Sequence, residues 1–484
     1  MNEIKIPLGV AMAGAPQALL ASMANRHGLI AGATGTGKTV TLQTLAEGFS
    51  AAGVPVFLAD VKGDLAGLAR PAEPGAKIVE RIRVLGLVDY QPRGNPLLLW
   101  DLEGRRGHPL RTTVADFGPL LLSTLLELND TQTGVLYAAF RIADDEGLAL
   151  LDFKDLRALL GWVADHAREL GAGYGNITAA SVGAIQRRLL VLEEQGAAPL
   201  FGEPALDLSD LMRTDFSGQG VISLLDATQL MARPRLYATF LLWLLAELFE
   251  NLPEVGDRDR PRLVFVFDEA HLLFDTAPKA LLEKIEQVVR LIRSKGVGIY
   301  FVTQNPQDVP EAVLGQLGNR VQHALRAFTP KDRAAVRAAA QNFRANPDVV
   351  VERLITELGV GEALVSVLDA HGSPTPVEPV RIYPPHSRLG PLTDDERAEQ
   401  LGRSPLAGRY DQPLDRESAH EVLMQRAQRG PAVSIDPEPP TGRGRQRETL
   451  LEATTKSALR AIGSQLGRQL VRGVLGSLLG GRRR

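Results

Sequence analysis

Residues 32–39 have the sequence GATGTGKT, the most informative segment of the chain for its fold. It matches the pattern G-x-x-x-x-G-K-[ST], in which glycines let backbone N–H groups close around a phosphate group. The apolar segment 26–31 precedes it, and a helical pattern follows from Thr39 to Ala51. A strand that enters this loop and continues as a helix is the context the motif requires, so an incidental glycine-rich turn is disfavoured.

The loop predicts a site for ATP and Mg²⁺. Lys38 is expected to reach the β- and γ-phosphates and so to take part in catalysis, and the Thr39 hydroxyl is a predicted Mg²⁺ ligand. The predicted nucleotide-binding residues are Gly32, Ala33, Thr34, Gly35, Thr36, Gly37, Lys38, Thr39 and Val40.

A second motif is an apolar strand that ends in two carboxylates. Residues 263–269 read LVFVFDE, which places Asp268 and Glu269 directly after the strand. Asp268 is expected to hold Mg²⁺, and Glu269 to act as the general base that activates the attacking water. A solvated strand end is the plain alternative, which the phosphate loop upstream disfavours. The pair predicts an ATPase, because a nucleotide switch with negligible turnover has less need of the second carboxylate.

Three further residues are candidates for catalysis. Gln304 follows the apolar segment 298–303 and is expected to sense the γ-phosphate; capping the turn before Pro306 is the alternative. Arg293 and Arg320 are candidates for the arginine finger, a cation that a neighbouring subunit often supplies to the transferring phosphoryl group. For either arginine, an ordinary surface ion pair is the alternative.

Apolar segments that alternate with helical patterns predict an α/β fold with a parallel sheet and helices on its faces. Between residues 116 and 215, apolar residues recur at helical spacing, so a helical subdomain inserted into the sheet is expected. The predicted division is an N-terminal part of the ATPase core with the phosphate loop (1–115), the helical insert (116–215), the C-terminal part of the core with the carboxylates, sensor and finger (216–385), a Pro/Gly/Arg-rich linker (386–446) and a basic amphipathic tail helix (447–484).

Charge is unevenly distributed along the chain. Residues 441–484 carry ten Lys or Arg against two Glu, whereas the remainder carries 44 basic and 55 acidic side chains. An acidic body disfavours a broad nucleic-acid-binding surface, so DNA contacts are expected from local patches or from the tail. The tail helix suits an anionic membrane surface or DNA; packing on a neighbouring subunit or partial disorder is the plain alternative.

The chain contains no cysteine, which excludes disulfides and Cys-ligated metal sites. Its N-terminus lacks the basic and apolar regions of a signal peptide, and no apolar run reaches the roughly 18 residues that a membrane span needs. We therefore expect a cytoplasmic protein without a transmembrane segment.

The order of motifs resembles the HerA/FtsK superfamily of hexameric DNA-pumping ATPases. After DEAH (268–271), the segment RSKGVG (293–298) places an arginine before a glycine turn, and a strand ends in TQNP (303–306). The turn DVKGD (60–64) is similar to the acidic turn after the second HerA strand. The run GLIAGATGTGKT (28–39) looks like that of the bacterial HerA-like, YjgR-type helicases. The resemblance covers roughly residues 8–385.

The resemblance implies a RecA-like P-loop NTPase fold and a homo-hexameric ring with ATP at the subunit interfaces. It also implies a central pore for duplex DNA, and thus a helicase or DNA translocase. By position, Arg293 matches the arginine before the glycine turn and ranks first as the finger, with Arg320 second. Lys62 is a candidate pore-loop residue, and His271 is expected to be structural or relay-like rather than a metal ligand.

Two departures from the HerA pattern keep a second function open. Only 31 residues precede Gly32, so the N-terminal barrel of archaeal-type HerA proteins is not expected, and Asn305 stands where those proteins usually have arginine. The alternative is a P-loop ATPase that acts on or scaffolds a protein partner and is not stimulated by DNA. The sequence does not define a nuclease or other protein partner.

Overall fold

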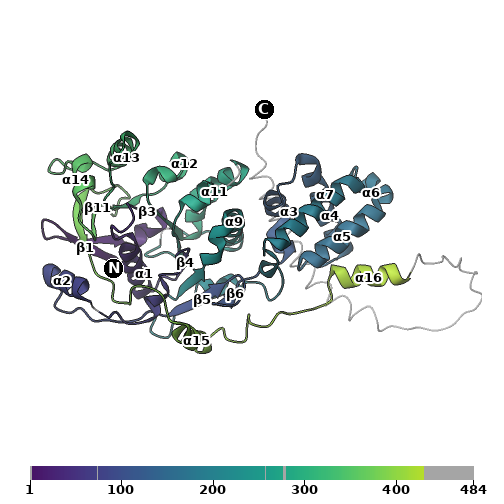
Figure 1. Ribbon diagram of the computed structural model, residues 1–484, viewed down its shortest axis with the longest axis horizontal. Helices are drawn as coiled ribbons and strands as arrows, with labels where there is room; N and C mark the ends of the chain where they lie inside the picture. The colour runs from purple at the N-terminus through teal and green to yellow at the C-terminus, as the bar shows by residue number, and fades with distance from the viewer. Residues whose placement is uncertain (1–2, 74, 257, 276–278, 430–484) are drawn as a thin grey trace, which may run out of the picture. The chain divides into compact units, whose positions relative to one another are not determined.

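The computed structural model describes residues 3–73, 75–256, 258–275 and 279–429. In this part of the chain, 12 strands form one mixed sheet (Figure 1). The strands are β1 (Lys5–Ala11), β2 (Pro16–Leu20), β3 (Gly28–Ala31), β4 (Val56–Asp60), β5 (Leu97–Asp101), β6 (His108–Pro109), β7 (Ile222–Asp226), β8 (Leu263–Phe267), β9 (Val297–Thr303), β10 (Asn319–Gln322), β11 (Glu362–Ser366) and β12 (Glu378–Ile382). Their order across the sheet is β2-β1-β12-β11-β10-β3-β9-β8-β4-β7-β5-β6.

The strands from β10 to β6 run parallel to one another. The central strands β9, β8 and β4 are buried along their whole length. Strands covered on both faces read as continuous apolar runs, which is why these three segments are recognisable in the sequence. β10 is short, and the chain leaves the sheet after Gln322.

Helices cover both faces of this parallel part. They include α1 (Lys38–Ala51), α9 (Pro234–Asn251) and α11 (Lys279–Ile292). Alternate residues of each strand join different cores: in β8, Val264 and Val266 pack in the core that contains Phe49 of α1, whereas Phe265 and Phe267 pack in the core that contains α9 and α11. The prediction of a parallel-rich α/β sheet flanked by helices is confirmed.

The other edge of the sheet is antiparallel and was not predicted from the sequence. β1 pairs with β2 on one side and with β12 on the other, and β12 continues through β11 to β10. Gly9 of β1 lies so close to β12 that an added Cβ would be 2.2 Å from the Arg381 carbonyl oxygen. The glycine therefore permits the close approach of two strands that are far apart in the sequence.

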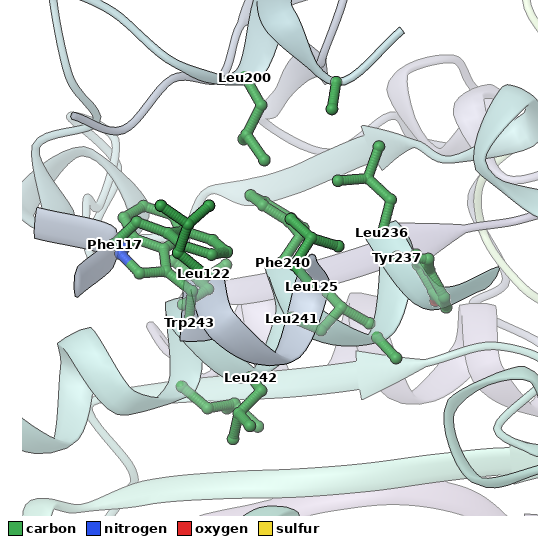
Figure 2. Close-up of a cluster of buried hydrophobic side chains, with 14 of the residues drawn as sticks. Phe117, Leu122, Leu125, Leu200, Leu236, Tyr237, Phe240, Leu241, Leu242 and Trp243 are labelled. Carbon is green, nitrogen blue, oxygen red and sulfur yellow. The ribbon is translucent and has the colours of Figure 1, made fainter. Parts of the chain in front are cut away.

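Helices fill the segment between β6 and β7. They are α3 (Val114–Leu125), α4 (Asp130–Glu146), α5 (Phe153–Asp165), α6 (Ala167–Tyr174), α7 (Ala179–Glu194) and α8 (Leu208–Leu211). Figure 2 shows Phe117, Leu122 and Leu125 of α3 beside residues of α9. This helical segment thus shares one apolar core with the sheet, and the packing shows no boundary near residue 115 or residue 215. The division of the chain into domains at these two positions remains a prediction.

Residues 386–446 are predicted as a linker, and this division remains a prediction. The described part of the segment contains α15 (Asp394–Gly402) and α16 (Ala419–Arg429). The Tyr410 hydroxyl donates to Asp210 (2.6 Å), and the Ser404 hydroxyl lies 2.7 Å from His108 Nε2. This segment therefore contacts both β6 at the edge of the sheet, through His108, and α8 of the helical segment, through Asp210. The predicted tail helix, 447–484, lies outside the described residues.

Candidate nucleotide-binding and hydrolysis site

The candidate residues gather where parallel strands end. In the register of the sheet, Ala31 of β3 pairs with Thr303 of β9, and Phe301 of β9 pairs with Phe267 of β8. The residues that follow these strands therefore lie at one edge of the sheet. The carboxyl edge of a parallel sheet is where α/β proteins bind their ligands. The structure thus brings the phosphate loop, Gln304 and the two carboxylates together.

The phosphate loop joins β3 to α1 and depends on its glycines. Gly32, Gly35 and Gly37 have φ values of 154°, 78° and 113°, a region that residues with a side chain rarely adopt. A Cβ on Gly32 would lie 2.5 Å from the Cβ of His323, so space as well as backbone conformation requires glycine there. The loop leads directly into the first turn of α1, where free N–H groups and the helix dipole favour an anion.

Lys38 is buried beneath this loop. Its ammonium group donates to the carbonyl oxygens of Gly32 (2.6 Å) and Ala33 (3.1 Å). Burial, and next the nearby charge of Lys62, lower the pKa of Lys38. A desolvated ammonium held by two carbonyls is well placed to exchange them for phosphate oxygens, which carry full negative charge. Thr39 and Val40 follow in the same turn, both partly buried.

Asp268 and Glu269 follow β8 and are both buried, at 5% and 4% exposure. Burial raises the pKa of Asp268 to about 6, against the opposing charge of Lys62. Glu269 has a φ of 49°, uncommon for a residue with a Cβ. Backbone conformations of this kind cluster at active sites, where the surrounding structure holds them in place.

Lys62, which the sequence suggests as a pore-loop residue, lies beside the two carboxylates of the candidate site. Its Nζ lies 2.5 Å from Glu269 Oε1 and 3.9 Å from Asp268 Oδ2. Burial alone raises the pKa of Glu269, but the hydrogen bond and charge of Lys62 outweigh burial, and the net pKa is lowered. The contact arises because Lys62 follows β4, and β4 is the strand next to β8 in the sheet.

Gln304 connects the phosphate loop to Glu269. The Thr34 hydroxyl donates to Gln304 Oε1, and Gln304 Nε2 donates to Glu269 Oε2, each at 3.4 Å. His271 Nδ1 lies 3.1 Å from the same Glu269 oxygen. The amide of Gln304 therefore lies between the two halves of the site, as a γ-phosphate sensor requires. The capping role before Pro306 belongs to Asn305, whose side chain accepts from Gln307 N.

The donor set fits Mg²⁺ with a nucleoside triphosphate. Mg²⁺ prefers oxygen ligands and is usually held by one or two carboxylates together with substrate phosphates. Thr39 and Asp268 provide a hydroxyl and a carboxylate beside the phosphate loop. Among the described residues there is no group of three or more histidine or acidic side chains arranged to hold a metal ion by itself.

The two arginines lie away from this edge. Arg293 is exposed in a 3-10 turn (Arg293–Lys295) before β9, and its charge acts on His27 at the start of β3. Arg320 donates to the carbonyl oxygens of Leu317 (3.0 Å), Asn342 (2.7 Å) and Leu314 (3.0 Å). Its guanidinium group thus already ties together three points of its own chain, which favours a structural role.

The fold and this edge of the sheet together define a P-loop protein of the RecA-like class. The sequence profile of the family described as "Helicase HerA-like C-terminal" matches residues 7–438 and 431–484, and the chain belongs to this family. No curated protein matches the chain in sequence. No helix in the described ranges is long and apolar enough to cross a membrane.

Solved structures of the plasmid coupling protein TrwB have a similar fold. TrwB with the non-hydrolysable GTP analogue GDPNP gives a TM-score of 0.51 at 16% identity, over 77% of this chain and 89% of that chain. TrwB with the ATP analogue ADPNP gives 0.50 at 15% identity, over 77% and 89%. TrwB with ADP and Mg²⁺ gives 0.50 at 15% identity, over 85% and 91%. At these identities, the likeness establishes the fold alone, and the prediction of a RecA-like fold is confirmed.

Proposed function

We propose that this protein is a HerA-like motor that hydrolyses ATP and moves duplex DNA as a homo-hexamer. The observation that carries the ATPase assignment is the position of Glu269. This buried carboxylate is joined through Gln304 to Thr34 of the phosphate loop. A general base must lie within reach of the water that attacks the γ-phosphate, and no other carboxylate of the motif pair faces Gln304.

Each residue of the site then has one role in hydrolysis. Lys38 binds the β- and γ-phosphates, and Thr39 and Asp268 hold Mg²⁺, which neutralises charge on those phosphates when bound. Glu269 accepts a proton from water as the water oxygen bonds to the γ-phosphorus. The bond from that phosphorus to the bridging oxygen breaks, and ADP and inorganic phosphate leave. Gln304 reports the presence of the γ-phosphate to Glu269.

The position of Arg293 rules out a role as the finger for the nucleotide of its own subunit. It precedes β9, whereas the phosphate loop lies at the opposite end of the neighbouring strand β3. β9 has seven residues, and at about 3.3 Å per residue it separates Arg293 from the nucleotide edge by roughly 20 Å. Arg293 is too far away to reach its own nucleotide, so a role as the finger requires a neighbouring subunit. The hexamer follows from the family resemblance.

Complementation between two inactive variants tests this shared site. Arg293→Ala subunits and Glu269→Gln subunits should each be inactive alone. Mixed before assembly, they should recover part of the ATPase rate, because some interfaces then combine an intact Arg293 with an intact Glu269. Arg290→Ala, which removes an exposed arginine one turn earlier, is the matched control and should stay active. Inactive mixtures, or an active Arg293→Ala protein, would rule out the trans-acting finger.

DNA is tested by the ATPase rate at low salt with and without duplex DNA. A DNA motor should be stimulated, and the stimulation should fall as salt rises, because salt competes for phosphate contacts. The acidic composition outside residues 441–484 favours the alternative, an ATPase that acts on a protein partner. A rate that is indifferent to DNA at low salt, yet absent in Glu269→Gln, would select that alternative.

A further inference from the structure

Lys62 faces the proposed base from a turn that the backbone fixes in place. The Asp60 carboxylate accepts hydrogen bonds from Gly63 N (2.7 Å) and Leu65 N (3.0 Å). Gly63 has a φ of 76°, which only glycine adopts readily. The turn after β4 therefore presents Lys62 in a defined direction. The Lys62 side chain nevertheless stays 37% exposed, so its outer part can be contacted from solvent.

The surroundings of Glu269 make the Lys62 contact dominant. Its other oxygen faces His271 and Gln304. Glu269 also interacts electrostatically with three further titratable groups. These are Lys38 of the phosphate loop, the neighbouring Asp268 and Tyr237 of α9. Among these described groups, the Lys62 ammonium is the one 2.5 Å from Glu269 Oε1, and its 37% side-chain exposure allows it to move toward solvent.

We propose that Lys62 is a gate on Glu269: while the ion pair is closed it withholds the carboxylate from the attacking water, and hydrolysis follows when Lys62 swings away. This inference rests on the proposed ATPase function. The Lys62 ammonium lies 2.5 Å from Glu269 Oε1, so while the pair is closed that oxygen faces the ammonium instead of the attacking water. Lys62 acts through Glu269 and is therefore a positioning residue. Because Lys62 is partly exposed, a ligand that contacts the turn 61–64 can open the pair.

The test measures kcat and KM for ATP in wild type and Lys62→Met. Removing the cation should raise kcat about three-fold or more, because the freed carboxylate oxygen can then face the attacking water. KM should stay unchanged because Lys62 binds Glu269 rather than phosphate. Lys62→Arg should behave as wild type.

Lys154→Met is the matched control. Lys154 has the same side-chain exposure, 37%, and pairs with Asp415 and Glu421. Its removal should leave kcat and KM unchanged. The double variant Lys62→Met/Glu269→Gln should be as slow as Glu269→Gln alone, because the gate acts only through the base.

The outcomes separate the two claims. A Lys62→Met protein with lower kcat and raised KM would make Lys62 a phosphate ligand and overturn the gate. An unchanged kcat in Lys62→Met would also overturn it, with the ATPase assignment intact. If wild type and Lys62→Met both bind ATP without hydrolysing it, the proposed function fails, and the gate fails with it.

Discussion

Glu269 is enclosed by side chains from separate segments of the chain: Lys62 after β4, Gln304 after β9 and His271 after β8. Gln304 is the one of these that also contacts the phosphate loop, through Thr34. Its two contacts make it the link between nucleotide and base.

Replacing Gln304 with alanine should therefore lower kcat and leave ATP affinity nearly unchanged. The loss should be about 10-fold or more, because misplacing a catalytic group by about 1 Å can cost 100-fold in rate. Steady-state kinetics together with equilibrium binding of a non-hydrolysable ATP analogue separates the two effects. Asn305→Ala, which changes only the adjacent turn, is the control. A variant with normal kcat and weak binding would show that Gln304 contacts the ground-state nucleotide instead.

At the residue level, the positions of Lys38, Asp268, Glu269 and Gln304 at one edge were predictable, because each follows a recognisable strand or loop. The Lys62 contact was not predicted, because it depends on β4 lying next to β8 in the sheet. Local sequence patterns do not reveal the order of strands in a sheet. The hydrogen bonds of Arg320 could not be predicted either, because the acceptors are backbone carbonyl oxygens, which every residue carries.

At the scale of elements, α9 is the helix on which the sheet and the helical segment meet. Trp243 is 4% exposed and stacks at a ring distance of 6.4 Å on Phe117 of α3. Figure 2 shows both residues within the same apolar cluster. The helical segment is thus attached to the sheet by core packing rather than by surface contacts.

Trp243→Ala should destabilise the protein by about 3–5 kcal/mol, because it removes a large buried side chain and leaves a cavity. Denaturant unfolding followed by circular dichroism measures the loss. Phe216, which is fully exposed, provides the control: Phe216→Ala should change stability by less than about 0.5 kcal/mol. Equal effects of the two substitutions would mean that α3 and α9 do not share a core.

The elements that sequence reasoning found share one property: they are continuous apolar runs such as β4, β8 and β9, or long periodic helices such as α9. The antiparallel strands β1, β2, β11 and β12 were missed. β1 contains Pro7 and Gly9, and its partner β12 lies near the other end of the described chain. Pairing of distant segments depends on tertiary packing, which local patterns do not report.

At the scale of the whole molecule, two buried neutral histidines predict how stability depends on pH. His27 Nδ1 accepts from Ile299 N (2.9 Å), and His323 lies between the Thr41 hydroxyl and the Glu362 carbonyl oxygen. Burial lowers the pKa of each to about 4 from 6.5. The unfolded chain therefore binds these protons more tightly than the folded chain does.

Stability should thus be full above about pH 6.5 and should fall as the pH drops toward 4, by on the order of 3 kcal/mol per histidine. Thermal unfolding at a series of pH values measures this. His27→Asn keeps a side-chain acceptor and suits the φ of 60° at this position, so it should reduce the loss between pH 6.5 and 4. A pH dependence identical to wild type would show that His27 is not the titrating group.

Single-turnover hydrolysis of ATP by Glu269→Gln shows whether Glu269 activates the attacking water. The amide keeps the size of the side chain but cannot accept the proton. Hydrolysis should fall at least about 100-fold, with ATP binding in the presence of Mg²⁺ retained. Hydrolysis at the wild-type rate in a variant that binds ATP normally would exclude Glu269 as the general base.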